Sequence, residues 1–342
     1  MKKILSALLV SAMILTSFAG CSTKTDSSSS STTTAATTTT AETTTAAETT
    51  TTAATTTVAG ATTTTKAGTT KTATVTTTVK KGNSYTAPAN LTGTVTFSGS
   101  TSVYPVAAAL TEAFRKKNPN VVTRIDNVTG SGAGLTDAIN KKVSFGMRSS
   151  AWDNSNAKIK PFQIALDGVA IVANTGNAAT NVTFANIKSI YSTGLAGFSN
   201  PIIREAGSGT RTCFEDVMKA NGGAPTYPGS IQTEASTDAV ISAVKGNVNS
   251  VGYASLGAAE NASGIKILQV EGVTASTANV LNGSYKFQRP FLLLHNTDMP
   301  LTNAEKEFLK FALSDEGQKI IASLNYISLS SSQLSTELGK VQ

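Results

Sequence analysis

The chain has 342 residues, and 28 Lys and Arg against 21 Asp and Glu give it a formal charge of +7. Residues 91–342 carry 21 basic and 18 acidic residues, an excess too small for the basic signature of a nucleic-acid-binding domain. The two cysteines, Cys21 and Cys213, cannot build a disulfide framework or a zinc site.

The first 21 residues have the pattern of a secretory signal. Lys2 and Lys3 precede an apolar stretch over residues 4–14, which is too short for a stable membrane span. The tetrad Phe-Ala-Gly-Cys that ends at Cys21 resembles a bacterial lipobox, in which the cysteine is acylated. We therefore predict a lipoprotein signal peptide over residues 1–20 and a lipid anchor at Cys21 on the extracytoplasmic face of the cell membrane. The alternative is an ordinary secretory signal with a chance cysteine.

Residues 22 to about 88 are nearly all Thr, Ala and Ser, with scattered Lys and Glu. The tract shows no apolar periodicity, and it cannot bury enough surface to offset the entropy of ordering. We assign residues 21–90 to a disordered tether that is a candidate for O-glycosylation.

Strand-like and helix-like segments alternate through the rest of the chain. Strands are predicted at residues 94–97, 121–125, 145–147, 168–173, 252–255, 265–270 and 290–295. Helices are predicted at residues 103–116, 135–139, 187–191, 216–219, 237–244 and 303–324. Repeated β–turn–α units predict an α/β fold with a mostly parallel sheet, in which ligands bind at the carboxyl ends of the strands.

Three Gly/Ser/Thr segments each open a predicted helix. They read GSTSVYP (residues 99–105), GSGAG (130–134) and REAGSGT (204–210). The start of a helix presents unpaired N–H groups and a partial positive charge, glycine allows close approach, and hydroxyls add donors. Three such turns, one of them with an arginine, predict an oxyanion pocket.

The sequence offers little for catalysis. No G-x-S-x-G motif accompanies a serine, the segment after Arg204 lacks the lysine of a phosphate-binding loop, and no metal-ligating cluster stands out. We expect no enzyme activity, no cofactor and no metal. The single histidine, His295, and the thiol of Cys213 are expected to be structural.

Six segments occur in one order: GSTSVYP, GSGAG, FGMRSS, IALDGVAIVAN, REAGSGTR and VGYASLG. This ordered set resembles the phosphate-binding component of bacterial phosphate ABC transporters, over essentially all of residues 91–342. The resemblance implies a type II periplasmic-binding-protein fold with a ligand cleft between two lobes. Lobe 1 is expected to comprise residues 91–170 and 288–342, and lobe 2 residues 171–287, with hinge crossings near residues 167–173 and 287–293.

The resemblance also implies a ligand set. The phosphate-binding residues would be Thr101, Ser102, Ser131, Ser149, Arg204, Ser208, Gly209 and Thr210. Ser149 stands where well-known members have a carboxylate that accepts the proton of hydrogen phosphate and so excludes sulfate. Asp167 is a possible replacement acceptor, and a turn or cap residue is the alternative. Thr101, Ser102 and Ser131 could instead be plain N-caps, and Arg204 could pair with Glu205 at the surface.

The function implied is the capture of inorganic phosphate and its delivery to the subunits of an ABC permease by a monomer that binds no nucleic acid. Two alternatives remain. One is a receptor for another tetrahedral oxyanion, with sulfate first because of Ser149. The other is a surface adhesion or sensory protein that keeps the fold without transport.

Overall fold

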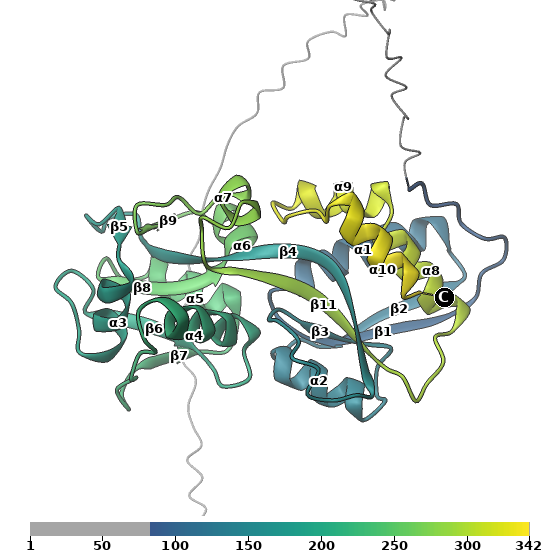
Figure 1. The fold of residues 1–342 in the computed structure, drawn as a ribbon, viewed down its shortest axis with the longest axis horizontal. Helices are drawn as coiled ribbons and strands as arrows, with labels where there is room; N and C mark the ends of the chain where they lie inside the picture. The colour runs from purple at the N-terminus through teal and green to yellow at the C-terminus, as the bar shows by residue number, and fades with distance from the viewer. Residues whose placement is uncertain (1–82, 342) are drawn as a thin grey trace, which may run out of the picture. The chain divides into compact units, whose positions relative to one another are not determined.

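The computed structural model describes residues 83–341. The predicted signal peptide, Cys21 and the tether up to residue 82 lie outside the described residues. Figure 1 shows two α/β lobes joined by two long strands. Within residues 83–341, no helix combines the length and the apolar character needed to span a membrane.

Lobe 1 takes its elements from both ends of the described chain. They are β1 (Gly93–Gly99), α1 (Tyr104–Lys117), β2 (Val121–Asn127), α2 (Ser131–Ile139), β3 (Phe145–Arg148), α8 (Asn303–Ala312), α9 (Asp315–Ser323) and α10 (Ser331–Gly339). The linking strands are β4 (Ile159–Asn174) and β11 (Gln288–Asn296). Lobe 2 comprises β5 (Asn181–Val182), α3 (Phe184–Ser192), β6 (Asn200–Arg204), α4 (Gly209–Asn221), β7 (Gln232–Glu234), α5 (Thr237–Lys245), β8 (Ser250–Ser255), α6 (Leu256–Glu260), β9 (Ile265–Ile267), β10 (Gln269–Val270) and α7 (Thr277–Leu281).

One sheet runs through both lobes in the order β2-β1-β3-β11-β4-β8-β6-β7. The pairs β1–β2, β1–β3, β6–β7 and β6–β8 are parallel, as the β–turn–α pattern predicts. The linking strands β4 and β11 run antiparallel to each other and to their neighbours β8 and β3. The sheet is therefore mixed, not mostly parallel, because the chain crosses between the lobes once in each direction.

Each lobe has its own hydrophobic core. Lobe 1 packs a group of aromatic rings between its sheet and α1 and α8, namely Phe97, Phe114, Phe145, Phe308 and Phe311. In lobe 2 the ring of Phe214 stacks on Tyr253 at 4.1 Å and lies parallel to Phe287 at 5.8 Å. Cys213 is buried in this second core, where burial raises the pKa of its thiol to about 12.

The predicted single helix over residues 303–324 is wrong, because the structure has two helices there, α8 and α9. Helix α8 ends before Leu313, and the hydroxyl of Ser314 accepts a hydrogen bond from the N–H of Gly317 at 3.2 Å to cap α9. A Cβ at Gly317 would lie 2.3 Å from the carbonyl oxygen of Phe311, so the turn is tight. The apolar spacing continues through the break, so periodicity does not show it, and the sequence signal for the break is the N-cap residue Ser314.

Residues 83–90, which the sequence analysis assigns to the tether, pack on lobe 1. The side chain of Asn83 donates to the carbonyl of Leu313 at 2.8 Å, and the ring of Tyr85 lies 5.3 Å from Phe311 and 6.2 Å from Phe114. A single aromatic residue at the end of a Thr-rich tract makes no periodic pattern. The ordered part therefore begins earlier than composition indicates.

Replacing Tyr85 with alanine removes its ring from this aromatic group. We expect the Tyr85→Ala variant to lose about 1–2 kcal/mol of unfolding free energy, because a half-buried ring gives up part of its buried apolar area. Denaturant unfolding measures the loss. The Thr86→Ala variant is the matched control, since Thr86 is exposed beside Tyr85. Equal stability of both variants would mean that the segment does not stabilise lobe 1.

Candidate functional site

The three predicted turns lie together where the two lobes meet, and a fourth helix start joins them. The hydroxyl of Ser102, after β1, lies 3.0 Å from that of Thr210 at the start of α4 and 3.1 Å from that of Thr237 at the start of α5. Thr101 is 3.4 Å from Thr237. This first network therefore joins lobe 1 to lobe 2 through side-chain hydroxyls.

A second network lies at the start of α2. The hydroxyl of Ser100 donates to that of Ser149 at 2.9 Å, and the backbone N–H of Ser149 donates to the hydroxyl of Ser131 at 3.1 Å. Gly209 of lobe 2 fits against this network, because a Cβ there would lie 2.4 Å from Ser131 Oγ and 2.7 Å from Ser149 Oγ. The two networks form what we call the hydroxyl cluster: Ser100, Thr101, Ser102, Ser131, Ser149, Thr210 and Thr237.

The N-cap alternative does not hold for Thr101, Ser102 or Ser131. Helix α2 is capped by Gly130 and α1 by Val103, neither with a side-chain bond, so Ser131, Thr101 and Ser102 are not conventional caps. The buried hydroxyl of Ser208, in contrast, accepts from the N–H of Arg211 and caps α4. Thr101 and Ser102 instead contact hydroxyls of lobe 2, and Ser131 contacts Ser149 within lobe 1.

Arg204 is a buried residue of the site and not part of a surface ion pair. Its side chain is 1% exposed, and it donates to both carboxylate oxygens of Glu205, at 2.7 and 2.8 Å. The remaining N–H groups reach Thr101 at 3.2 Å and Thr237 at 3.4 Å. The carboxylate balances the guanidinium charge, and the guanidinium holds two hydroxyls of the cluster.

A second buried arginine approaches the cluster from the linking strands. Asp167 on β4 accepts from Arg289 on β11 at 3.0 and 2.8 Å, and also from Ser255 at 2.9 Å. Burial raises the pKa of Asp167, and the bonds from Arg289 and Ser255 oppose that shift. Arg289 then donates to the hydroxyl of Thr210 at 2.7 Å and to the carbonyl of Ser149 at 3.2 Å. The proton-acceptor role of Asp167 stays a prediction.

The site therefore pairs each arginine with a carboxylate and surrounds the two pairs with hydroxyls. A threonine oxygen that accepts from a guanidinium has its own hydrogen free to donate elsewhere. Thr101, Thr210 and Thr237 are all in this position. Neutral donors near the helix starts can satisfy the oxygens of a bound oxyanion, while each buried arginine keeps a carboxylate as its partner.

Comparison with known proteins places the chain in a family. Residues 84–316 match the model of a PBP superfamily domain, that is, a periplasmic-binding-protein domain. The chain belongs to the PBP superfamily. A solved structure assigned as a phosphate ABC transporter substrate-binding protein, with bound phosphate, from Clostridium perfringens is 34% identical to the chain. It covers 70% of this chain and 100% of its own, with a TM-score of 0.64.

Two further proteins are similar to the chain. An ABC-type phosphate transport receptor from Vibrio cholerae is 28% identical, covers 69% of this chain and 100% of its own, and has a TM-score of 0.57. Phosphate-binding protein PstS 2 of Streptococcus pneumoniae is 32% identical over 169 residues, 48% of this chain and 53% of that protein. The chain thus spans about half the length of this curated relative. The predicted two-lobed type II fold is confirmed.

Sequence reasoning missed three residues of this candidate site: Ser100, Thr237 and Arg289. Thr237 follows the N-cap Ser236, a helix-start signal like the three that were recognised. Arg289 directly precedes the apolar run at residues 290–294 and is itself buried, and a buried charge requires a partner. Each could be suspected from its local sequence, but the contact with the cluster depends on the fold.

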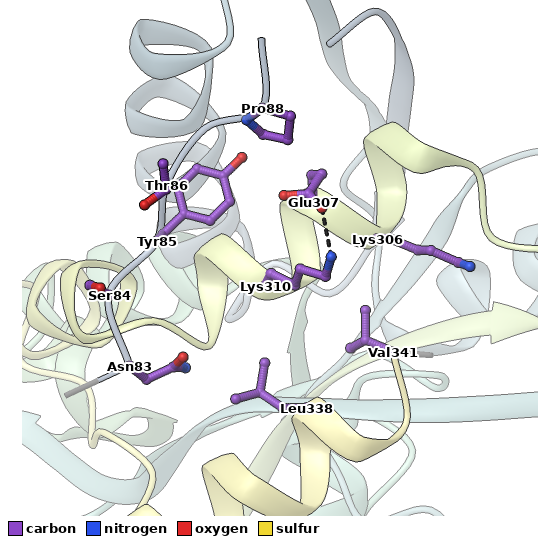
Figure 2. Close-up of a pocket in the computed structure, with 10 residues that line it drawn as sticks. All are labelled: Asn83, Ser84, Tyr85, Thr86, Pro88, Lys306, Glu307, Lys310, Leu338 and Val341. Atoms are coloured by element: carbon purple, nitrogen blue, oxygen red, sulfur yellow. Dashed lines mark hydrogen bonds and ion pairs between the residues drawn. The ribbon is translucent and has the colours of Figure 1, made fainter. Parts of the chain in front are cut away.

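The hydroxyl cluster is distinct from a cavity of about 600 Å³ on lobe 1 (Figure 2). That cavity lies between residues 83–88 and helices α8 and α10, and its walls include Lys306 and an ion pair between Lys310 and Glu307 at 2.7 Å. It shares no lining residue with the hydroxyl cluster.

An added methyl group at Gly209 cannot fit between the lobes. We expect the Gly209→Ala variant to hold the lobes apart, because its Cβ overlaps the hydroxyls of Ser131 and Ser149. Small-angle X-ray scattering should give a larger radius of gyration, while the unfolding free energy changes by less than about 1 kcal/mol. Gly229→Ala is the control, since its Cβ meets open space. An unchanged radius for Gly209→Ala would contradict this packing.

Proposed function

We propose that the chain binds inorganic phosphate between its lobes and delivers it to an ABC permease. The observation that carries the proposal is the hydroxyl cluster, in which donors of both lobes meet around two charge-balanced arginines. The C. perfringens relative with bound phosphate and the V. cholerae phosphate transport receptor support the same ligand. Neither relative's name describes an enzyme, and we propose a binding protein without catalysis.

Binding requires the lobes to separate and close again. Ser102 and Thr210 are 3.0 Å apart, so a tetrahedral anion must take the place of this direct contact. Once bound, the anion receives donors from both lobes, and its affinity for the closed state exceeds that for the open one. Phosphate occupancy is thereby coupled to lobe closure, and a permease can distinguish the closed form from the open form.

The sequence pattern of residues 1–21 supports an extracytoplasmic, membrane-anchored location. We propose that Cys21 carries the lipid anchor and that the Thr-rich tract connects it to the lobes on the extracytoplasmic side. The phosphate-binding residues we propose are the predicted set, with Arg204, Ser131 and Thr210 central. We propose that the receptor acts as a monomer.

Sulfate is the second candidate ligand. Ser149 offers no carboxylate, and the carboxylates of Asp167 and Glu205 are both bonded to arginines. A site made of donors discriminates less strongly against an anion that carries no proton. This observation favours sulfate above other rivals.

Calorimetric titration decides between the two ligands. The chain without residues 1–20 and with Cys21→Ser, stripped of ligand by unfolding and refolding, is titrated with phosphate and then with sulfate. We expect phosphate to bind with micromolar or lower Kd. Sulfate heat of equal size would indicate a general oxyanion receptor, and no heat from either anion would refute the proposed function.

Two substitutions test the pocket directly. We expect Arg204→Ala and Ser131→Ala each to weaken phosphate binding at least tenfold, about 1.4 kcal/mol, because each removes a donor or its support. Thermal unfolding should remain cooperative in both variants. Glu112→Ala, on an exposed ion pair with Lys116, is the control. If both variants bind phosphate with wild-type affinity, the assignment of Arg204 and Ser131 to the phosphate site is wrong.

A further inference from the structure

We propose that Arg289 is a positioning residue of the anion site, which turns the hydroxyl of Thr210 toward the anion and ties both lobes to the linking strands. This inference rests on the proposed function, since it concerns the same site. It goes beyond the predicted ligand set, in which Arg289 has no place.

The position of Arg289 is fixed by the sheet. Its Cα is paired with that of Asp167 in the antiparallel ladder of β11 and β4, so the side chains stand opposite each other. Both side chains are 1% exposed. Nε and Nη2 of Arg289 donate to one oxygen of Asp167, which leaves Nη1 directed toward the site. The ion pair thus holds the guanidinium plane in one orientation.

Nη1 sets the polarity of Thr210. It donates to the threonine hydroxyl at 2.7 Å, shorter than the 3.2 and 3.4 Å contacts of Arg204 with Thr101 and Thr237. An arginine cannot give up its proton or accept a bond, so Thr210 must accept from it. The hydrogen of Thr210 is therefore available to Ser102 or to an anion that replaces that contact.

Arg289 also joins the two hydroxyl networks. Its second Nη1 bond, at 3.2 Å, goes to the backbone carbonyl of Ser149 in lobe 1, while Thr210 belongs to lobe 2. A carbonyl directed at an anion would repel it, and this bond satisfies the carbonyl oxygen instead. One guanidinium on a linking strand thus contacts a wall of the site in each lobe. A purely structural ion pair would need only the bonds to Asp167.

A double-mutant cycle tests this role. Removing Arg289 alone would leave a buried carboxylate unpaired, so the pair is removed together as Asp167→Asn/Arg289→Met. Phosphate affinity is measured by calorimetry for the unsubstituted chain, Thr210→Val, the pair variant and the combined variant, each with Cys21→Ser and without residues 1–20. We expect pair removal to weaken binding at least tenfold with Thr210 present and less than threefold with Val at that position. The shift in Tm should be the same in both backgrounds.

The conservative variant Arg289→Lys keeps the inference testable if the pair variant does not fold. A lysine ammonium can pair with Asp167 but lacks the planar fork that also reaches Thr210 and Ser149. We expect it to fold with a near-native Tm and to bind phosphate at least fivefold more weakly.

Equal factors in both backgrounds, or full affinity in Arg289→Lys, would overturn the positioning role while the proposed function stands. Failure of the unsubstituted chain to bind phosphate would overturn both.

Discussion

The site depends on charge balance between two buried arginines and their carboxylates. An unpaired buried charge costs several kcal/mol, so Arg204 and Arg289 can lie in the interior only because Glu205 and Asp167 accept from them. Each pairing uses part of a guanidinium and leaves other N–H groups for the surrounding hydroxyls. The arginines therefore act on the hydroxyls that line the site, and the formal charges there sum to zero.

The fold supplies the geometry that this arrangement needs. Parallel strands bring the segments after β1, β2, β3 and β6 to one region, and helix starts add donors there. The antiparallel linking strands place Asp167 and Arg289 opposite each other between the lobes. Glycines permit the close approach, since a side chain at Gly209 would overlap Ser131 and Ser149. The strand order, the register of β4 and β11 and the small residues at the contact together place the hydroxyl cluster beside the Asp167–Arg289 pair.

What the sequence predicts well is local. The Gly/Ser/Thr turns that contain Ser102, Ser131 and Thr210 carry their own signal, because a strand, a turn and a helix follow one another within a short stretch of sequence. Arg289 and Thr210 are 79 positions apart, and Arg289 and Asp167 are 122 apart, so no local pattern links them. The ordered family motifs predicted two lobes correctly. Apolar periodicity missed the break between α8 and α9, because a capping serine leaves the apolar spacing unchanged. It also missed the packing of Tyr85 on lobe 1, because a single ring makes no periodic pattern.

The direction of the arginine–threonine hydrogen bonds determines how a site without a free carboxylate can hold a protonated anion. Thr210 and Thr237 accept from arginines, so their hydrogens point away from those arginines and toward Ser102 or the ligand. The partners of Ser102 in its network are these two threonine hydroxyls, and without an anion its oxygen can accept from both. When an anion takes the hydrogens of the two threonines, the lone pairs of Ser102 are freed to accept. The Ser102 oxygen can then accept a hydrogen bond from the hydroxyl of a protonated anion, the part that the resemblance gives to a carboxylate at the position of Ser149.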